Sequence, residues 1–175
     1  IASSACLGGE LPQIIMRDNP YPVDDIIPEQ FNLEAAGKVV EEFIDIFGDD
    51  YYLELQRNGH KEQKLVNEAI LQLAKKYNVK CIATNDVHFV EKEDYPAHKM
   101  LICINTNKEY VDDKVASDED SDNGMAYSGE EYFRTHDEMS ALFADHPEVI
   151  ANTQEIVDKV EVISLHHPAT LPRFE

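Results

Sequence analysis

The sequence predicts an α/β fold in which parallel strands alternate with helices, followed by a helical carboxyl-terminal extension. Two short apolar segments have the character of strands, residues 51–56 (YYLELQ) and residues 79–84 (VKCIAT). Between them, residues 61–77 show the apolar repeat of an amphipathic helix. Parallel strands need a crossover of this kind and length. We therefore expect the two strands to lie side by side, with the helix packed across them.

The segments around this unit extend the alternation. Residues 95–104 follow the second strand and again have helical period. Upstream, residues 17–32 contain three prolines and are expected to form an irregular surface excursion before a helix at residues 33–47. Strands that are covered by helices on both faces read as near-continuous apolar runs, and functional sites gather at their carboxyl ends.

The carboxyl-terminal part is expected to contain two helices. Thr135 and Glu138 have the spacing of a capping box, and the apolar residues that follow form a stripe at helical period. Pro147 suits the first turn of a second helix. The amino-acid pattern thus places a helical pair at the end of the α/β unit.

An acidic and an imidazole side chain follow the strand at residues 79–84. Asp86 and His88 are two residues apart, and in an extended strand they would point to the same side. Together they offer one oxygen and one nitrogen ligand for a divalent metal. An isolated Asp-x-His is more often a helix cap with a locally bonded histidine. The position at a strand end is what favours a metal site here.

Cys6 is a candidate for a third ligand. It stands just before a Gly-Gly turn, where a thiolate could project from a strand end. Taken alone, a single cysteine is more often a small buried apolar residue. The other histidines have no partner at ligand spacing and are interpreted as structural; they are His98, His136, His146, His166 and His167.

The chain is strongly acidic, with 35 Asp and Glu against 15 Lys and Arg and a net charge of −20. Contacts with phosphates need Lys and Arg, so this segment is not expected to grip DNA. Much of the excess lies in residues 109–122 (EYVDDKVASDEDSD), which we expect to form a mobile loop. The ligand spacing and central glycine of a calcium loop are absent from it.

Size and composition predict one intracellular domain. The 175 residues are 43% hydrophobic, and no apolar run approaches the length of a membrane span, so no membrane contact is expected. The cysteines are odd in number and lie in or near apolar segments, which suits a reducing cytoplasm; they are Cys6, Cys81 and Cys103.

Four runs in this order closely resemble the PHP domain of bacterial DNA polymerase III alpha subunits. They are SSACLGGE (3–10), IFGDDYYLELQRNGHKEQ (46–63), CIATNDVHF (81–89) and EMSALFADHPEVIA (138–151). The resemblance implies a partial, distorted, TIM-like β/α barrel. Its metal ligands would fall on Cys6, Asp86 and His88, with zinc or manganese as the metal. Asn58 departs from the pattern, because many relatives have histidine in that turn, whereas in this chain a histidine, His60, stands two residues later.

The resemblance also implies how the chain is divided. Residues 1–107 would be the later half of the barrel, residues 108–128 an acidic loop insertion, residues 129–165 the helical end of the PHP region and residues 166–175 a linker toward the polymerase palm. The chain has no initiator methionine, and the remaining ligands and the palm carboxylates lie outside it. We therefore expect a fragment that is inactive alone and, as half a barrel, exposes sheet edges.

The function implied is that of a replicative DNA-directed DNA polymerase, a magnesium-dependent nucleotidyltransferase, with 3′ to 5′ exonuclease activity in the PHP domain. Its partners would be the rest of the polymerase chain, the sliding clamp, the clamp loader and a proofreading exonuclease subunit, with DNA bound through other domains. Two alternatives stay open. The domain could be a docking scaffold without catalysis, or the chain a free-standing PHP phosphoesterase.

Overall fold

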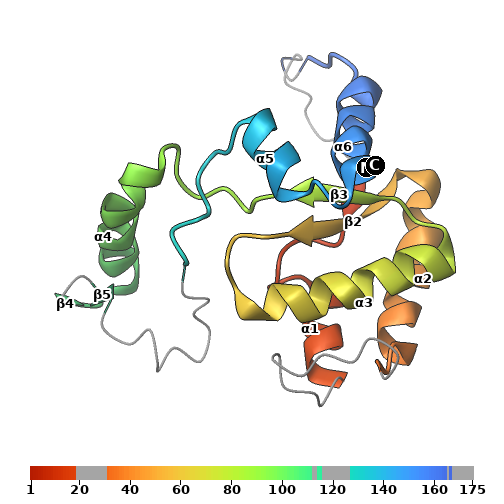
Figure 1. The fold of residues 1–175 in the computed structure, drawn as a ribbon, viewed down its shortest axis with the longest axis horizontal. Helices are drawn as coiled ribbons and strands as arrows, with labels where there is room; N and C mark the ends of the chain where they lie inside the picture. Colours follow the sequence, from red (N-terminus) through yellow and green to blue (C-terminus); the bar gives the residue numbers. More distant parts are fainter. Residues whose placement is uncertain (19–30, 112–113, 116–126, 165, 167–175) are drawn as a thin grey trace, which may run out of the picture.

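A three-stranded parallel sheet lies at the centre of the molecule (Figure 1). The computed structural model describes residues 1–18, 31–111, 114–115, 127–164 and 166. The strands of the sheet, in spatial order, are β1 (Ala2–Ser3), β2 (Tyr51–Gln56) and β3 (Cys81–Thr84). The expected parallel pairing of the second and third strands is confirmed.

The register brings the carboxyl ends of all three strands to one edge of the sheet. Ser3 pairs with Tyr52, and Gln56 pairs with Thr84. Because parallel strands run in the same direction, the residues that follow each of them emerge at this edge. Figure 1 shows the helices on either side of the sheet, with α3 and its neighbours on one side and α5 and α6 on the other.

The helices predicted at residues 33–47, 61–77 and 95–104 are present, with shifts of no more than two residues at their ends, whereas the helix at residues 10–18 was not predicted. Their bounds are α1 (Glu10–Asp18), α2 (Glu34–Phe47), α3 (Lys61–Tyr77), α4 (Tyr95–Thr106), α5 (His136–Leu142) and α6 (Pro147–Lys159). Short 3-10 turns stand at Gly48–Asp50 and Lys92–Asp94. Asn78 ends α3 in a left-handed conformation, and Thr135 and Glu138 form the expected capping box on α5.

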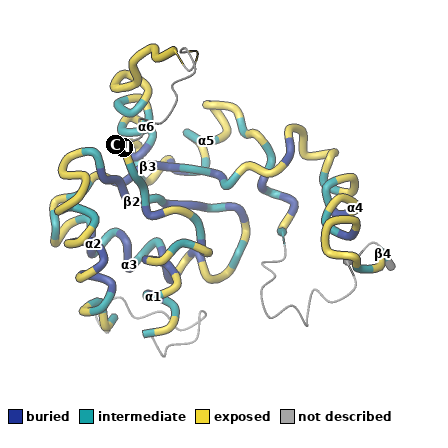
Figure 2. The backbone as a smooth tube through the Cα atoms, turned by 180° about the vertical axis from the view of Figure 1, so that it is seen from behind, coloured by how far each residue is buried: buried dark blue, intermediate teal, exposed yellow. Residues whose placement is uncertain are grey.

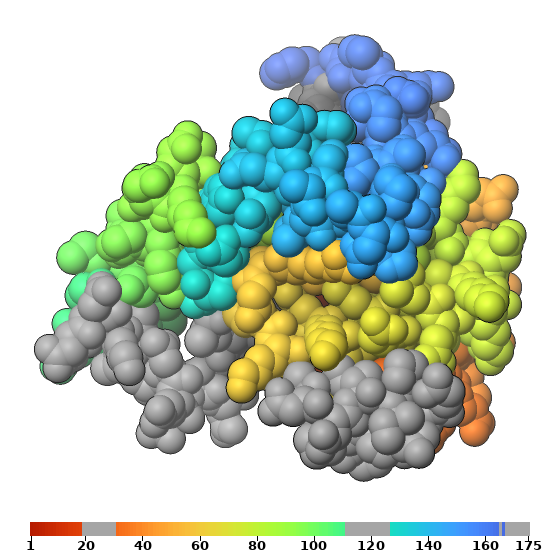
Figure 3. All heavy atoms as spheres, in the orientation of Figure 1, coloured from red at the N-terminus to blue at the C-terminus, as the bar shows by residue number. Residues whose placement is uncertain are grey.

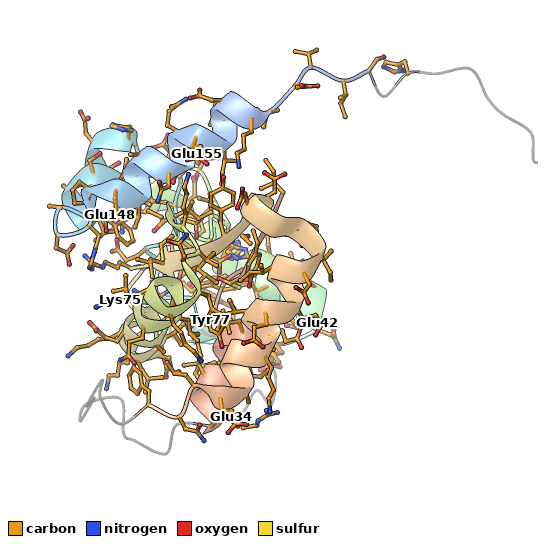
Figure 4. All side chains as sticks on the ribbon, turned by 90° about the vertical axis from the view of Figure 1, so that its right-hand side faces the viewer. Glu34, Glu42, Lys75, Tyr77, Glu148 and Glu155 are labelled. Carbon is orange, nitrogen blue, oxygen red and sulfur yellow. The ribbon has the colours of Figure 1, made fainter. Side chains whose placement is uncertain are left out.

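The core lies between the sheet and the helices α1, α2 and α3. Leu53 in the central strand and Ile70 in α3 are fully buried. Figure 2 shows the buried part of the backbone concentrated on the strands and on the inner faces of these helices. Tyr77 at the end of α3 lies against α2, where its hydroxyl is so close to Gly37 that a Cβ there would collide with it (Figure 4).

Helix α6 covers the other face of the sheet. The Asn152 side chain donates a hydrogen bond of 2.8 Å to the carbonyl oxygen of Cys81 in β3. About one turn further along the helix, Glu155 accepts a hydrogen bond of 2.9 Å from the hydroxyl of Tyr52 and pairs with Lys80 (Figure 4). These contacts fix α6 along β3 and hold the central and edge strands together.

Three expectations from the sequence differ from the structure or lie outside it. Within the acidic run at 109–122, strands β4 (Tyr110–Val111) and β5 (Lys114–Val115) form an antiparallel pair where only a loop was expected. Most of the acidic run, residues 19–30 of the predicted excursion, and the linker at 166–175 except His166 fall outside the described residues. The strands that are described form an open sheet and a hairpin, and the barrel stays a prediction.

None of the helices in the described ranges is both long enough and apolar enough to cross a membrane.

Candidate metal centre

A pocket of about 160 Å³ opens at the carboxyl ends of the three strands. It is lined by Cys6, Leu7, Gln56, His60, Gln63, Asp86, His88, Tyr127 and Glu131. All three candidate ligands therefore share one pocket, although they are separated by up to 82 positions along the chain (6 to 88). The parallel sheet is the reason, because it delivers the residue after each strand to the same edge.

Cys6 reaches the pocket through a tight turn after β1. Ala5 adopts a left-handed backbone conformation with φ 60°, and the amide of Gly9 donates a hydrogen bond of 2.8 Å to the carbonyl oxygen of Cys6. Burial raises the pKa of the Cys6 thiol, and the neighbouring Asp86 carboxylate raises it further. The thiol is therefore disfavoured as a thiolate unless a cation enters the pocket.

Asp86 and His88 come together for a different reason from the one expected. Strand β3 ends at Thr84, and Asp86 has a left-handed backbone with φ 46°, so the alternation of side chains in a strand does not apply. The turn instead brings the carboxylate oxygen Oδ1 of Asp86 to 3.5 Å from Nε2 of His88. The two side chains are about one-third exposed, so both remain accessible from the pocket.

His60 and Glu131 form a buried pair in the pocket wall that the sequence did not reveal. His60 follows β2, and its Nε2 lies 2.9 Å from Oε1 of Glu131, whose side chain is only 1% exposed. Burial alone would raise the pKa of Glu131, but hydrogen bonds from His60 and Ser128 outweigh it and lower that pKa to about 2. The bond to Glu131 raises the pKa of His60.

Aromatic rings close the pocket on the side of α4. The ring of Tyr127 stands edge-on to the ring of His88, with centroids 4.5 Å apart, and its hydroxyl oxygen lies 3.3 Å from Nδ1 of His88. His98 in α4 packs on both rings, at 4.7 Å from Tyr127 and 5.7 Å from His88. Its Nε2 atom is buried and has no hydrogen-bond partner among the described residues.

This contact places His98 beside His88, although His98 itself does not line the pocket. The sequence marked it as structural because no ligand stood at a helical spacing from it. The contact joins α4 to the turn after β3. It therefore could not be predicted from the spacing of residues within α4. Like His98, His136 and His146 do not line this pocket.

The donor chemistry of the pocket suits a divalent cation. A thiol, a carboxylate and an imidazole provide the ligand types that zinc accepts, and a cation would relieve the unfavourable contact between Cys6 and Asp86. As they stand, no three His, Cys, Asp or Glu side chains in the described ranges are arranged to hold a metal ion. The described residues therefore form no complete ligand group by themselves.

Comparison with known proteins assigns the chain to a family. No protein-family model matches it. DNA polymerase III subunit alpha of Campylobacter jejuni is 36% identical over all of this chain, and that of Borreliella burgdorferi is 32% identical over all of it. The protein of the same name from Thermus aquaticus is 35% identical over 93% of the chain. The chain spans only 12–14% of the length of these relatives. Along its whole length it therefore corresponds to a segment of the DNA polymerase III alpha subunit family.

Proposed function

We propose that this chain is part of the PHP domain of a replicative DNA polymerase and that Cys6, Asp86 and His88 contribute to a divalent metal centre for phosphoester hydrolysis. The observation that supports this most is the shared pocket at the carboxyl ends of three parallel strands. In the full-length alpha subunit the reaction would be 3′ to 5′ exonuclease cleavage of a primer end.

The three side chains have distinct roles in this proposal. Bound zinc or manganese would acidify a water molecule and stabilise the charge of the phosphoester oxygens. The Asp86 carboxylate and the Cys6 thiolate would supply negative charge that favours a cation, and His88 would supply a neutral nitrogen. The remaining ligands would come from parts of the alpha subunit outside this chain.

The polymerase reaction itself would belong to other domains of the full-length subunit. A magnesium-dependent nucleotidyltransferase needs palm carboxylates, and it binds DNA through basic surfaces, whereas this chain carries a net charge of −20. The partners we propose are the rest of the polymerase chain, the sliding clamp, the clamp loader and a separate exonuclease subunit. All of this would take place in the cytoplasm.

A docking scaffold without catalysis is the second candidate, and two observations favour it. The described residues provide no complete ligand group. In addition, helix α4 stands to one side of the sheet (Figure 1) and exposes Met100, Leu101 and Ile104, which are 53%, 57% and 75% accessible. Apolar side chains gathered on one exposed helix are typical of surfaces that pack against another domain or subunit.

Metal content tests the proposed centre. In the full-length alpha subunit, Asp86→Asn and His88→Ala should each reduce bound zinc or manganese, because each removes a ligand. His136→Ala is the matched control, since this histidine is exposed on α5 and does not line the pocket. The measurement is metal content by mass spectrometry after dialysis. Wild-type metal content in both pocket variants would remove these residues from the site.

A further inference from the structure

We propose that Tyr127 is a positioning residue of this centre, whose phenol oxygen accepts a hydrogen bond from Nδ1–H of His88 and so turns Nε2 toward Asp86. The inference rests on the proposed function. Its geometric basis is a pair of contacts on one imidazole ring. Nδ1 lies 3.3 Å from the Tyr127 hydroxyl oxygen, and Nε2 lies 3.5 Å from Oδ1 of Asp86.

The chemistry of a metal-binding histidine explains why this contact matters. A neutral imidazole carries one proton, so the nitrogen that binds a metal must be the one without it. When Nδ1–H donates a hydrogen bond to the Tyr127 oxygen, Nε2 carries no proton, and its lone pair faces the carboxylate and the pocket. Such partners of metal-binding histidines fix both the tautomer and the ring orientation. Here a phenol takes the place of the carboxylate or carbonyl that more often does so.

The position of Tyr127 is set from α4, independently of His88. The hydroxyl of Tyr95 donates a hydrogen bond to the main-chain carbonyl oxygen of Tyr127. Two residues later, Gly129 has φ +89° and lies so close to the Tyr95 ring that a Cβ would meet it at 2.9 Å. A residue with a side chain would be strained there and would push the segment away from α4. The segment beginning at Tyr127 lies between α4 and the rest of the molecule (Figure 3).

The buried Glu131 carboxylate fixes the same segment from the side of the sheet. It accepts hydrogen bonds of 2.9 Å from the main-chain amides of Ser128 and Gly129. It is also hydrogen-bonded to the side chain of His60, which follows β2 in the chain. The amide of His88 donates a hydrogen bond of 2.8 Å to the carbonyl oxygen of Glu131, which ties the two segments together. Tyr127 is therefore held by anchors on both sides of the pocket.

Helix α4 also restrains the ring of Tyr127. His98 stands edge-on to this ring, with an angle of 84° between the two planes, and Tyr127 is edge-on to His88. The three rings form a compact cluster in which the Tyr127 phenol has little freedom to leave Nδ1 of His88. A hydrogen bond with a preset acceptor orients its partner without the entropic cost of ordering both groups.

The test uses the full-length alpha subunit and Tyr127→Phe, which removes the hydroxyl and keeps the ring. The control is Tyr132→Phe, a hydroxyl on the same segment that is bonded to Glu138 and Arg134 and does not line the pocket. Zinc affinity is measured by competition with a chelator. We expect Tyr127→Phe to weaken zinc about tenfold, in the range for lost partners of metal-binding histidines, and the control to match the wild type.

A spectroscopic readout separates positioning from folding. Cobalt(II) in place of zinc should give a d–d spectrum that changes in Tyr127→Phe, because the imidazole is reoriented, and stays unchanged in the control. A third variant, Tyr127→Leu, removes the ring as well. Wild-type affinity and spectrum in Tyr127→Phe, with loss only in Tyr127→Leu, would show that the ring packs and the hydroxyl positions nothing, which overturns the inference.

The same measurements distinguish a failure of this inference from a failure of the proposed function. If Asp86→Asn and His88→Ala lose metal while Tyr127→Phe behaves as the wild type, the centre exists and Tyr127 has no positioning role. If Asp86→Asn and His88→Ala retain their metal, the centre itself is wrong, and the inference falls with it.

Discussion

Asp86→Asn and His88→Ala in the full-length alpha subunit are expected to lower primer degradation without nucleotides by about a hundredfold or more, because removing a ligand costs at least as much as removing a group that supports one. The two side chains lie 3.5 Å apart in one pocket, so each variant removes a neighbouring donor from the same centre. Polymerization should persist, because its carboxylates would lie in another domain. The measurement is shortening of a labelled primer over time.

This experiment also separates catalysis from the scaffold alternative. His136→Ala should degrade the primer at the wild-type rate, since it lies away from the pocket. If the wild type itself binds metal but does not degrade primer, the metal has a structural role and the scaffold is the better account. If degradation persists unchanged in both pocket variants, the activity belongs to another site.

Glu131→Ala is expected to destabilise the pocket wall by about 3–5 kcal/mol, the usual cost of leaving a buried ion pair without one partner. The change deprives His60 and the amides of Ser128 and Gly129 of their acceptor. Local opening should then expose residues 128–134, with amide exchange at least about a hundredfold faster. Hydrogen exchange of the peptide that covers these residues, in the full-length subunit, is the measurement.

Glu130→Gln is the matched control for this variant. Its carboxylate is 32% exposed and pairs with Lys92 and Arg134 near the surface, so its loss should cost less than about 1 kcal/mol. Equal exchange in the two variants would mean that the buried pair does not hold the segment, and it would weaken the anchoring argument for Tyr127 as well.

The same pair gives the stability of the chain a defined pH dependence. The folded pKa of Glu131, about 2, is depressed below the ordinary value of 4.5. Its contribution of about 3 kcal/mol is therefore present above pH 4.5 and lost as the pH falls toward 2. The pKa of His60 is raised above 6.5, so its contribution is present below pH 6.5 and lost at higher pH. Thermal unfolding against pH should show a smaller acid loss in Glu131→Gln than in the wild type, because the remaining loss comes from other paired carboxylates such as Asp145.

The central βαβ unit could be predicted from the sequence because its signals are local. Strand 51–56 and helix 61–77 agree with the structure at both ends, since an apolar run and an apolar stripe of helical period stand next to each other. Helix capping at Thr135 was also visible, because Thr135 and Glu138 lie only three positions apart in the sequence. These elements place Cys6, Asp86 and His88 at one sheet edge.

The supporting residues could not be predicted because their partners are distant in the chain. Glu131 lies 71 positions from His60, and Tyr127 lies 39 positions from His88. Neither residue stands in a motif, and the acidic run at residues 109–122 separates them from the α/β unit. The left-handed turn at Asp86 could not be predicted either. An extended strand would also bring Asp86 and His88 to the same side, so the sequence pattern does not distinguish the two backbone conformations.

Cobalt(II) absorption of the full-length alpha subunit tests the central claim most directly, since a thiolate bound to cobalt gives a charge-transfer band that carboxylate and imidazole ligands do not. A bound metal deprotonates the thiol that coordinates it, although burial and Asp86 raise the pKa of free Cys6. Cys81→Ser is the control, because Cys81 is buried in β3 and does not line the pocket. We predict that the band is present in the wild type and in Cys81→Ser and absent in Cys6→Ser. A band that persists in Cys6→Ser, or that is missing from the wild type with cobalt bound, would contradict the account.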